Sequence, residues 1–171
     1  CVTALTMSGQ PTRRFAFEAF LPREKKERAA ILEELKNETR TIILYEAPHH
    51  LRQTLEELYQ TLGNREITIC KELTKRYENA AKTTLEDVLA YYKENEPRGE
   101  YVLVVAGKSK EALVEEQRQE WEKLTLEEHM AHYENGGMDR KEAMKQVAKD
   151  RGISKRDVYR ALLEGKEPEN N

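Results

Sequence analysis

Ionisable side chains follow directly after an apolar run in the stretch Thr41 to His50, TIILYEAPHH. The first five of these residues are β-branched, aliphatic or aromatic, as a buried strand requires, and Ala47-Pro48 ends the strand and can open a helix. Glu46, His49 and His50 would therefore lie at the carboxyl edge of the strand, where ligands bind in open α/β sheets. A carboxylate in that position is a candidate base for a proton transfer.

A second edge of the same kind occurs at Ile67 to Lys75, ITICKELTK, where a short apolar strand runs into charged residues. The candidate bases at strand edges are Glu46, Glu72, Lys75 and Glu100. Arg98 and Lys75 are also suited to holding phosphate. The residue types alone do not identify the catalytic base, because Glu46 and Glu72 could equally have a structural role as acceptors of hydrogen bonds from the backbone or from an arginine. The clustering of polar residues at the strand ends indicates a functional site more strongly than any single residue does. The cluster comprises Tyr45, Glu46, His49, Glu72, Thr74 and Lys75.

Strand-like and helix-like segments alternate through the first hundred residues, which predicts an α/β fold. The expected strands are Arg14–Phe20, Thr41–Tyr45, Ile67–Cys70 and Tyr101–Val105. Between the second and third strands, leucines recur at helical spacing before Gly63 and predict a helix that covers one face of the sheet. These elements place the candidate bases at the ends of strands.

The composition changes sign after Gly107. Residues 111–134 hold eight acidic and two basic side chains, whereas residues 139–160 hold eight basic and four acidic ones. We expect the acidic stretch to form a connecting helix that repels RNA. The basic stretch is typical of a helix-turn-helix, with Asp139 and Ser154 as N-caps and Gly152 ending the first helix.

The expected core of this helical part is small, and its members are Ala143, Val147, Ala148, Ile153, Val158 and Leu162. Eight basic side chains are left largely outward, namely Arg140, Lys141, Lys145, Lys149, Arg151, Lys155, Arg156 and Arg160. Such a surface can meet phosphates. From the residues alone, an ordinary helical tail with solvated lysine-rich faces is an equally good interpretation.

Four segments carry a resemblance to a known family: SGQPTRRFAFEAFLPR, YEAPH, KELTK and PRGEYVLVVAG. In this order and along nearly the whole chain, they resemble the ribosomal RNA small-subunit methyltransferase I (RsmI) family of the tetrapyrrole-methylase superfamily. The resemblance implies the carboxyl-terminal half of a tetrapyrrole-methylase-like fold, a mixed sheet flanked by helices, followed by a small helix-turn-helix-like domain. The implied boundaries are a methyltransferase subdomain at 1–108, an acidic connecting helix at 109–135 and a basic domain at 136–171.

The resemblance implies methyl transfer from S-adenosyl-L-methionine to the ribose 2'-hydroxyl of a cytidine in the decoding region of 16S rRNA, free or in the small ribosomal subunit, with no metal. The protein then has to align donor and hydroxyl and assist loss of the hydroxyl proton. The catalytic candidates are Glu46, Glu72 and Lys75. The positions expected to touch the cofactor are Tyr45, Glu46 and Leu73. The expected RNA contacts are Arg98, Arg140, Lys141, Lys145, Lys149, Lys155, Arg156 and Arg160.

The chain opens with Cys1 and enters the family pattern partway along a helix, so we expect the glycine-rich amino-terminal half of the enzyme to be missing from it. On its own, the chain should then bind the methyl donor weakly or not at all and be inactive. A homodimer is expected from the superfamily.

Two other functions stay open at this point. One is methylation of a tetrapyrrole such as a corrin precursor on the same scaffold, since a shared fold does not fix the substrate. The other is a non-catalytic RNA-binding adaptor. The net charge of −3, the charged fraction of 36% and the lack of a long apolar run favour a cytoplasmic protein that does not span a membrane.

Two cysteines are too few for a disulfide framework. His129 and His132 lie one helical turn apart, and without further ligands a solvated helix face is a better interpretation than a zinc site.

Overall fold

The computed structural model describes residues 1–164, which fall into two compact units, Cys1–Ser109 and a second unit that begins at Lys110. Each unit has its own hydrophobic core. The predicted α/β fold with a mixed sheet flanked by helices is confirmed in the first unit.

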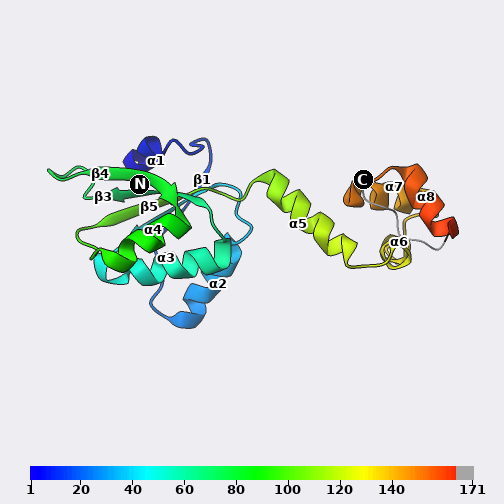
Figure 1. The fold of residues 1–171 in the computed structure, drawn as a ribbon, viewed down its shortest axis with the longest axis horizontal. Coiled ribbons are helices and arrows are strands. Elements are labelled where there is room, and N and C mark those ends of the chain that lie inside the picture. The colour runs from blue at the N-terminus through cyan, green and yellow to red at the C-terminus, as the bar shows by residue number, and fades with distance from the viewer. Residues whose placement is uncertain (165–171) are drawn as a thin grey trace. The chain divides into compact units, whose positions relative to one another are not determined.

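The first unit is built on a five-stranded sheet with the strand order β1-β2-β5-β3-β4 (Figure 1). Its strands are β1 (Phe15–Phe20), β2 (Thr41–Glu46), β3 (Glu66–Lys71), β4 (Asn79–Thr84) and β5 (Tyr101–Val105). β1 and β2 are parallel, whereas β5 runs antiparallel to β2 and to β3, and β4 runs antiparallel to β3. Strands β1, β2 and β3 therefore point the same way.

Helices cover both faces of this sheet, which explains why β2 is apolar on successive residues. Ile42 and Leu44 pack on the side of α2 (Lys25–Leu35), α3 (Pro48–Leu62) and α4 (Leu85–Glu94), while Ile43 packs with α1 (Val2–Ser8) on the other side. The helix predicted from the leucine spacing is α3, with Pro48 in its first turn and Gly63 at its end.

The strand β4 was not predicted from the sequence. Its residues, NAAKTT, have no alternation of apolar and polar side chains, and most of them are exposed. The strand forms because its backbone completes the hydrogen bonding of β3, from Glu66 paired with Thr84 to Lys71 paired with Asn79.

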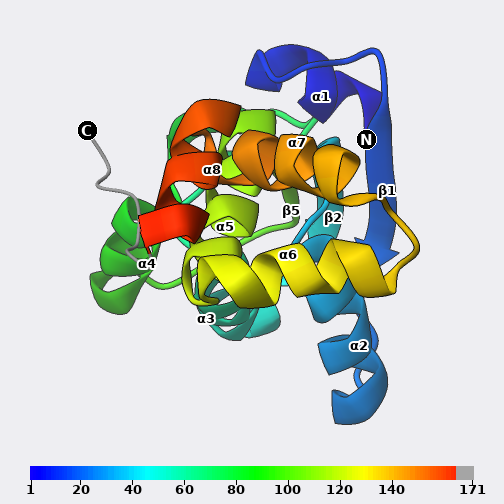
Figure 2. The same ribbon diagram turned by 90° about the vertical axis from the view of Figure 1, so that its right-hand side faces the viewer.

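The second unit consists of α5 (Lys110–Glu122), α6 (Leu126–Asn135), α7 (Arg140–Arg151) and α8 (Lys155–Glu164). Where one connecting helix was expected, the structure has α5 and α6, because Thr125 begins a new helix with a capping box to Glu128. Figure 2 shows α6 and α7 side by side, with α8 lying across them. The predicted basic domain includes residues 165–171, which lie outside the described residues.

The predicted caps of the helix-turn-helix are confirmed. Asp139 accepts a hydrogen bond from the Glu142 N–H, Ser154 accepts one from the Asp157 N–H, and Gly152 ends α7 in the left-handed conformation. The core contains the predicted residues together with Leu126 and Met130 from α6.

Two predictions for the second unit were wrong. Arg151 does not face outward but is 4% exposed, because its guanidinium donates to the carbonyl oxygens of Trp121 and Leu124 and to Nδ1 of His129. His129 is likewise not on a solvated face. It is fully buried and stacks on Trp121 with ring centroids 4.1 Å apart.

Within residues 1–164, no helix combines the length and the apolar character needed to cross a membrane. The same residues contain no group of three or more histidine, cysteine or acidic side chains placed to hold a metal ion.

Candidate active site

The carboxyl ends of β2 and β3 meet at one edge of the sheet, on either side of the start of β5. Tyr101, the first residue of β5, pairs with Glu46 on one side and with Lys71 on the other. The two polar segments picked out in the sequence are thus brought to the same edge, with one antiparallel strand between them.

Glu46 is buried in a short chain of hydrogen bonds beneath α3. One oxygen of its carboxylate accepts from the Ala47 N–H at 2.8 Å, and the other accepts from the Thr54 hydroxyl. That hydroxyl in turn accepts from Nη2 of Arg28 at 2.6 Å. The Thr54 hydroxyl therefore links the Arg28 guanidinium to the Glu46 carboxylate through two hydrogen bonds, and it fixes the orientation of the carboxylate.

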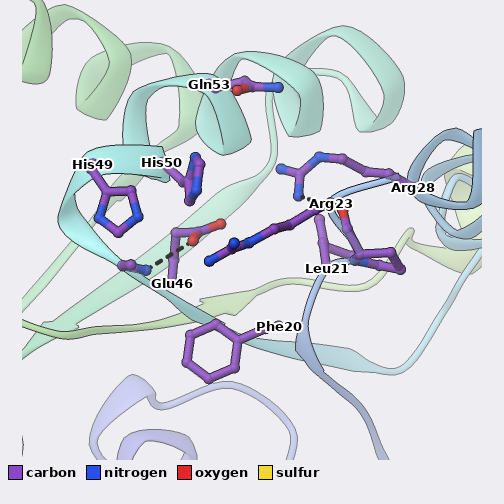
Figure 3. A pocket seen from close by; sticks show the side chains of 10 residues that line it. Phe20, Leu21, Arg23, Arg28, Glu46, His49, His50 and Gln53 are labelled. Carbon is purple, nitrogen blue, oxygen red and sulfur yellow. Dashed lines mark hydrogen bonds between the residues drawn. The ribbon is translucent and has the colours of Figure 1, made fainter. Parts of the chain in front are cut away.

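A cavity of about 390 Å³ opens beside Glu46. Figure 3 shows the Arg23 side chain extending toward the Glu46 carboxylate, with the two imidazole rings of His49 and His50 on one side and the Phe20 ring on the other. The cavity combines one carboxylate, two imidazoles, guanidinium groups and an aromatic face. Such a lining suits a ligand with a flat ring and an anionic group.

The second polar segment forms a separate charged cluster at the end of β3. The Glu72 N–H donates to the Glu100 carbonyl at 2.9 Å, and the Glu100 N–H donates back to Oε1 of Glu72 at 2.8 Å. Nζ of Lys75 lies 3.3 Å from Oε1 of Glu72 and 2.9 Å from Oε2 of Glu100. Lys75 therefore sits between two carboxylates.

These contacts fix the protonation states of the cluster. The Glu100 N–H is the main cause that lowers the pKa of Glu72 below its usual range, and Lys75 adds to it. The carboxylates of Glu100 and Glu72 raise the pKa of Lys75. At neutral pH, Lys75 is a cation that can donate hydrogen bonds and hold an anion, but it cannot accept a proton.

The backbone of the cluster adopts an unusual conformation. Glu72 and Thr74 have φ angles of 53° and 64°, in the left-handed region that side chains other than glycine rarely adopt. Gly99 has a φ of 82° and packs directly on Glu72, whose Oε1 would lie 2.6 Å from a Cβ at that position. Strain of this kind persists where the surrounding structure holds it, and it concentrates at functional sites.

The residues expected to touch the cofactor divide between the two faces of the sheet. Tyr45 lies on the α1 side, where its ring meets Phe17 and Phe20 edge to face. Leu73 packs against the core on the same side, whereas Glu46 points to the α3 side.

No hydrogen bond or ion pair among residues 1–164 joins Glu46 to Glu72 or Lys75. The structure therefore brings Glu72, Lys75 and Glu100 together and keeps Glu46 in a distinct site along the same edge. The predicted RNA contacts are all exposed, with Arg98 just before β5 and the others on α7 and α8.

The residues that complete the Glu46 site were not predicted from the sequence. Phe20 is the last residue of β1, Arg23 follows that strand, and Arg28 and Thr54 lie on α2 and α3. A signal for Thr54 exists in the sequence, since this polar residue interrupts the buried stripe between Leu51 and Leu58. Arg23 and Arg28 carry no comparable signal, because arginines in a charged segment are ordinarily solvated.

Residues 2–89 match the family model of the tetrapyrrole (corrin/porphyrin) methylases. The chain is 47% identical over 92% of its length to a ribosomal RNA small subunit methyltransferase I of Halalkalibacterium halodurans, and 46% identical over 94% to that of Bacillus subtilis. It spans 54% of the length of each of these relatives.

A solved structure of the methyltransferase CobJ superimposes with a TM-score of 0.50 at 16% identity, covering 62% of this chain and 46% of that one. At this level of identity, the likeness concerns the fold alone.

Proposed function

Since the chain belongs to the tetrapyrrole (corrin/porphyrin) methylase family and resembles ribosomal RNA small subunit methyltransferases I over most of its length, we propose that the whole protein methylates ribosomal RNA with S-adenosyl-L-methionine. The proposed target is the ribose 2'-hydroxyl of a cytidine in the decoding region of 16S rRNA, free or in the small ribosomal subunit. We propose a cytoplasmic location and a homodimer for the whole protein.

One observation carries the choice of RNA over a tetrapyrrole. The methylase family model ends at residue 89, whereas the similarity to the relatives named for ribosomal RNA covers 92% of the chain and so extends through most of the second unit. That unit presents the exposed basic side chains of α7 and α8, which suit a polyanion and have no evident use with a tetrapyrrole.

S-Adenosyl-L-methionine supplies an electrophilic methyl carbon, and the hydroxyl that attacks it has to lose a proton. In this proposal the carboxylates of Glu46 and Glu72 are the candidate proton acceptors. Lys75 stays protonated and holds a phosphate or a developing negative charge.

The apolar surfaces of Tyr45 and Leu73 suit contacts with the cofactor on the α1 side, and the Glu46 carboxylate is a polar partner on the other side. These residues make up part of a cofactor site. We therefore propose that the 171-residue chain by itself binds S-adenosyl-L-methionine weakly and is inactive. Calorimetric titration of the chain with the cofactor tests this, and tight binding would contradict it.

The decisive experiment uses the full-length protein with labelled S-adenosyl-L-methionine. Small ribosomal subunits and tetrapyrrole precursors are offered separately, and the RNA is digested to nucleosides. Label in 2'-O-methylcytidine supports the proposal. Label found only in a tetrapyrrole would overturn the proposal and indicate a tetrapyrrole methyltransferase. RNA binding without any methyl transfer would indicate a non-catalytic RNA-binding adaptor.

A further inference from the structure

We propose that the hollow between Arg13, Arg14 and Arg40 is a binding site for the phosphate groups of an RNA backbone. It lies where β1 and β2 begin, so it is at the opposite edge of the sheet from the candidate active site. The inference rests on the proposed function in one respect, namely that the substrate is an RNA.

The three arginines come from two separate segments that the sheet brings together. Phe15, the first residue of β1, pairs with Thr41, the first residue of β2, so the residues that precede the two strands become neighbours. They enclose an open hollow of about 560 Å³ lined by Arg13, Arg14, Phe15, Thr39 and Arg40. This space is large enough for a phosphodiester and its adjoining sugar.

Two of the three arginines of the hollow are not paired with an acidic side chain of the described residues, whereas the third is. Arg40 is held by two hydrogen bonds to Glu38, and the carboxylate of Glu18 also acts on it. Arg13 and Arg14 are exposed and make no hydrogen bond or ion pair with any described residue. They differ in this from Arg28, Arg40 and Arg52 of the same unit, each of which is paired with a glutamate.

The backbone beneath the arginines is fixed. Gly107 packs against the Thr39 carbonyl so closely that a Cβ there would lie 2.2 Å from the oxygen, and the Lys108 N–H donates to the Glu38 carbonyl at 2.7 Å. On the other segment, the Thr41 hydroxyl donates to the Pro11 carbonyl at 2.8 Å. The backbone from which these side chains extend is therefore held in place around the hollow, and less backbone entropy is lost when an anion binds.

Guanidinium groups favour phosphate because their planar set of donors matches two phosphate oxygens. Two unpaired arginines in one hollow can hold one or two phosphates of a strand that passes over this edge. A neutral ligand would leave both charges without a partner.

The test measures binding of the 171-residue chain to a fluorescent single-stranded RNA of 20 nucleotides between 50 and 200 mM salt, without methyl donor. The double variant Arg13→Gln, Arg14→Gln is compared with Lys25→Gln, Lys26→Gln, which removes the same charge from exposed side chains on α2. We expect the arginine variant to bind about 10-fold more weakly and to lower the slope of log K against log salt by about 1.4. The lysine variant should stay within about twofold of the wild type.

Equal losses in the two variants would show a diffuse effect of charge and overturn the site. Competition by inorganic phosphate at micromolar concentration, with RNA affinity unchanged in the arginine variant, would reassign the hollow to a small anion and also overturn the inference. Failure of the wild-type chain to bind RNA would do the same. Because no methyl transfer is measured, these results are independent of whether the full-length protein methylates 16S rRNA.

Discussion

Glu72 and Glu100 bind each other twice, since each backbone N–H donates to the other residue, in one case to the carbonyl oxygen and in the other to the carboxylate. The pair closes the loop after β3 onto the start of β5. It fixes the Glu72 carboxylate in an ionised state, which is the state that a proton acceptor or a partner for Lys75 needs.

The first prediction concerns this carboxylate. In the full-length protein, Glu72→Gln should lower kcat by about 100-fold or more, because the amide keeps the hydrogen bond from Glu100 but accepts no proton and pairs with no cation. Glu94→Gln, an exposed change at the end of α4, serves as the control and should leave kcat unchanged. Single-turnover methylation measures the effect. An equal rate in both variants would remove Glu72 from the reaction.

The second prediction concerns Gly99. Its φ of 82° and the contact with the Glu72 carboxyl group leave no room for a methyl group. Gly99→Ala should therefore displace Glu72 and destabilise the first unit by about 1–3 kcal/mol. Urea unfolding measures the loss, and NMR shifts of the Glu72 and Lys75 amides report the displacement. Gly63→Ala is the matched control, because it also has positive φ but nothing lies within 4 Å of its added Cβ. Unmoved amides in Gly99→Ala would contradict the prediction.

The third prediction concerns the hydrogen bonds of Glu46. Thr54→Val has nearly the same shape but leaves the buried Glu46 carboxylate without one donor and Nη2 of Arg28 without its acceptor. We expect a loss of about 1–3 kcal/mol in the free energy of unfolding. Thr61→Val, on the same helix, removes a hydroxyl that has no such bonds and should cost less than 0.5 kcal/mol or so. Urea unfolding measures the free energy of unfolding of both variants. Equal losses of stability in the two would show that Thr54 acts by packing alone.

The sequence predicted the arrangement of the site because strand direction is encoded in local pattern. Once β2 and β3 are recognised as apolar runs that end in charged residues, a sheet that aligns them brings Glu46 and Glu72 to one edge. What the pattern did not predict is that β5 separates the two strands, and that the two carboxylates point to different partners. Strand order depends on contacts between distant residues, which periodicity does not report.

The two wrong predictions for the second unit have the same cause. Arg151 and His129 were assigned to solvent because polar side chains at helical spacing are ordinarily exposed. In the structure, several buried acceptors satisfy the Arg151 guanidinium, and the indole of Trp121 covers the His129 ring. Burial of such groups depends on donors and acceptors supplied by another helix, and these partners cannot be read from the helix itself.

The last prediction follows from the burial of His129. Desolvation lowers the pKa of this imidazole below its usual value of 6.5, the positive charge of Arg151 lowers it further, and the carboxylate of Asp150 opposes them. The nitrogen Nδ1 accepts a hydrogen bond from Arg151, which also requires a neutral ring. As the pH falls through about 6.5, the unfolded chain binds a proton at this histidine and the folded unit does not.

The second unit should therefore lose stability as the pH falls through about 6.5, by at most about 1.4 kcal/mol per pH unit, and the loss should end below the folded pKa. Trp121 is the single tryptophan of the chain and contacts His129, so its fluorescence reports the unfolding directly. His129→Phe should remove this part of the pH dependence. Met130→Ala, a buried change on the same helix, should lower stability at every pH but keep the slope. A slope that survives in His129→Phe would place the titrating group elsewhere.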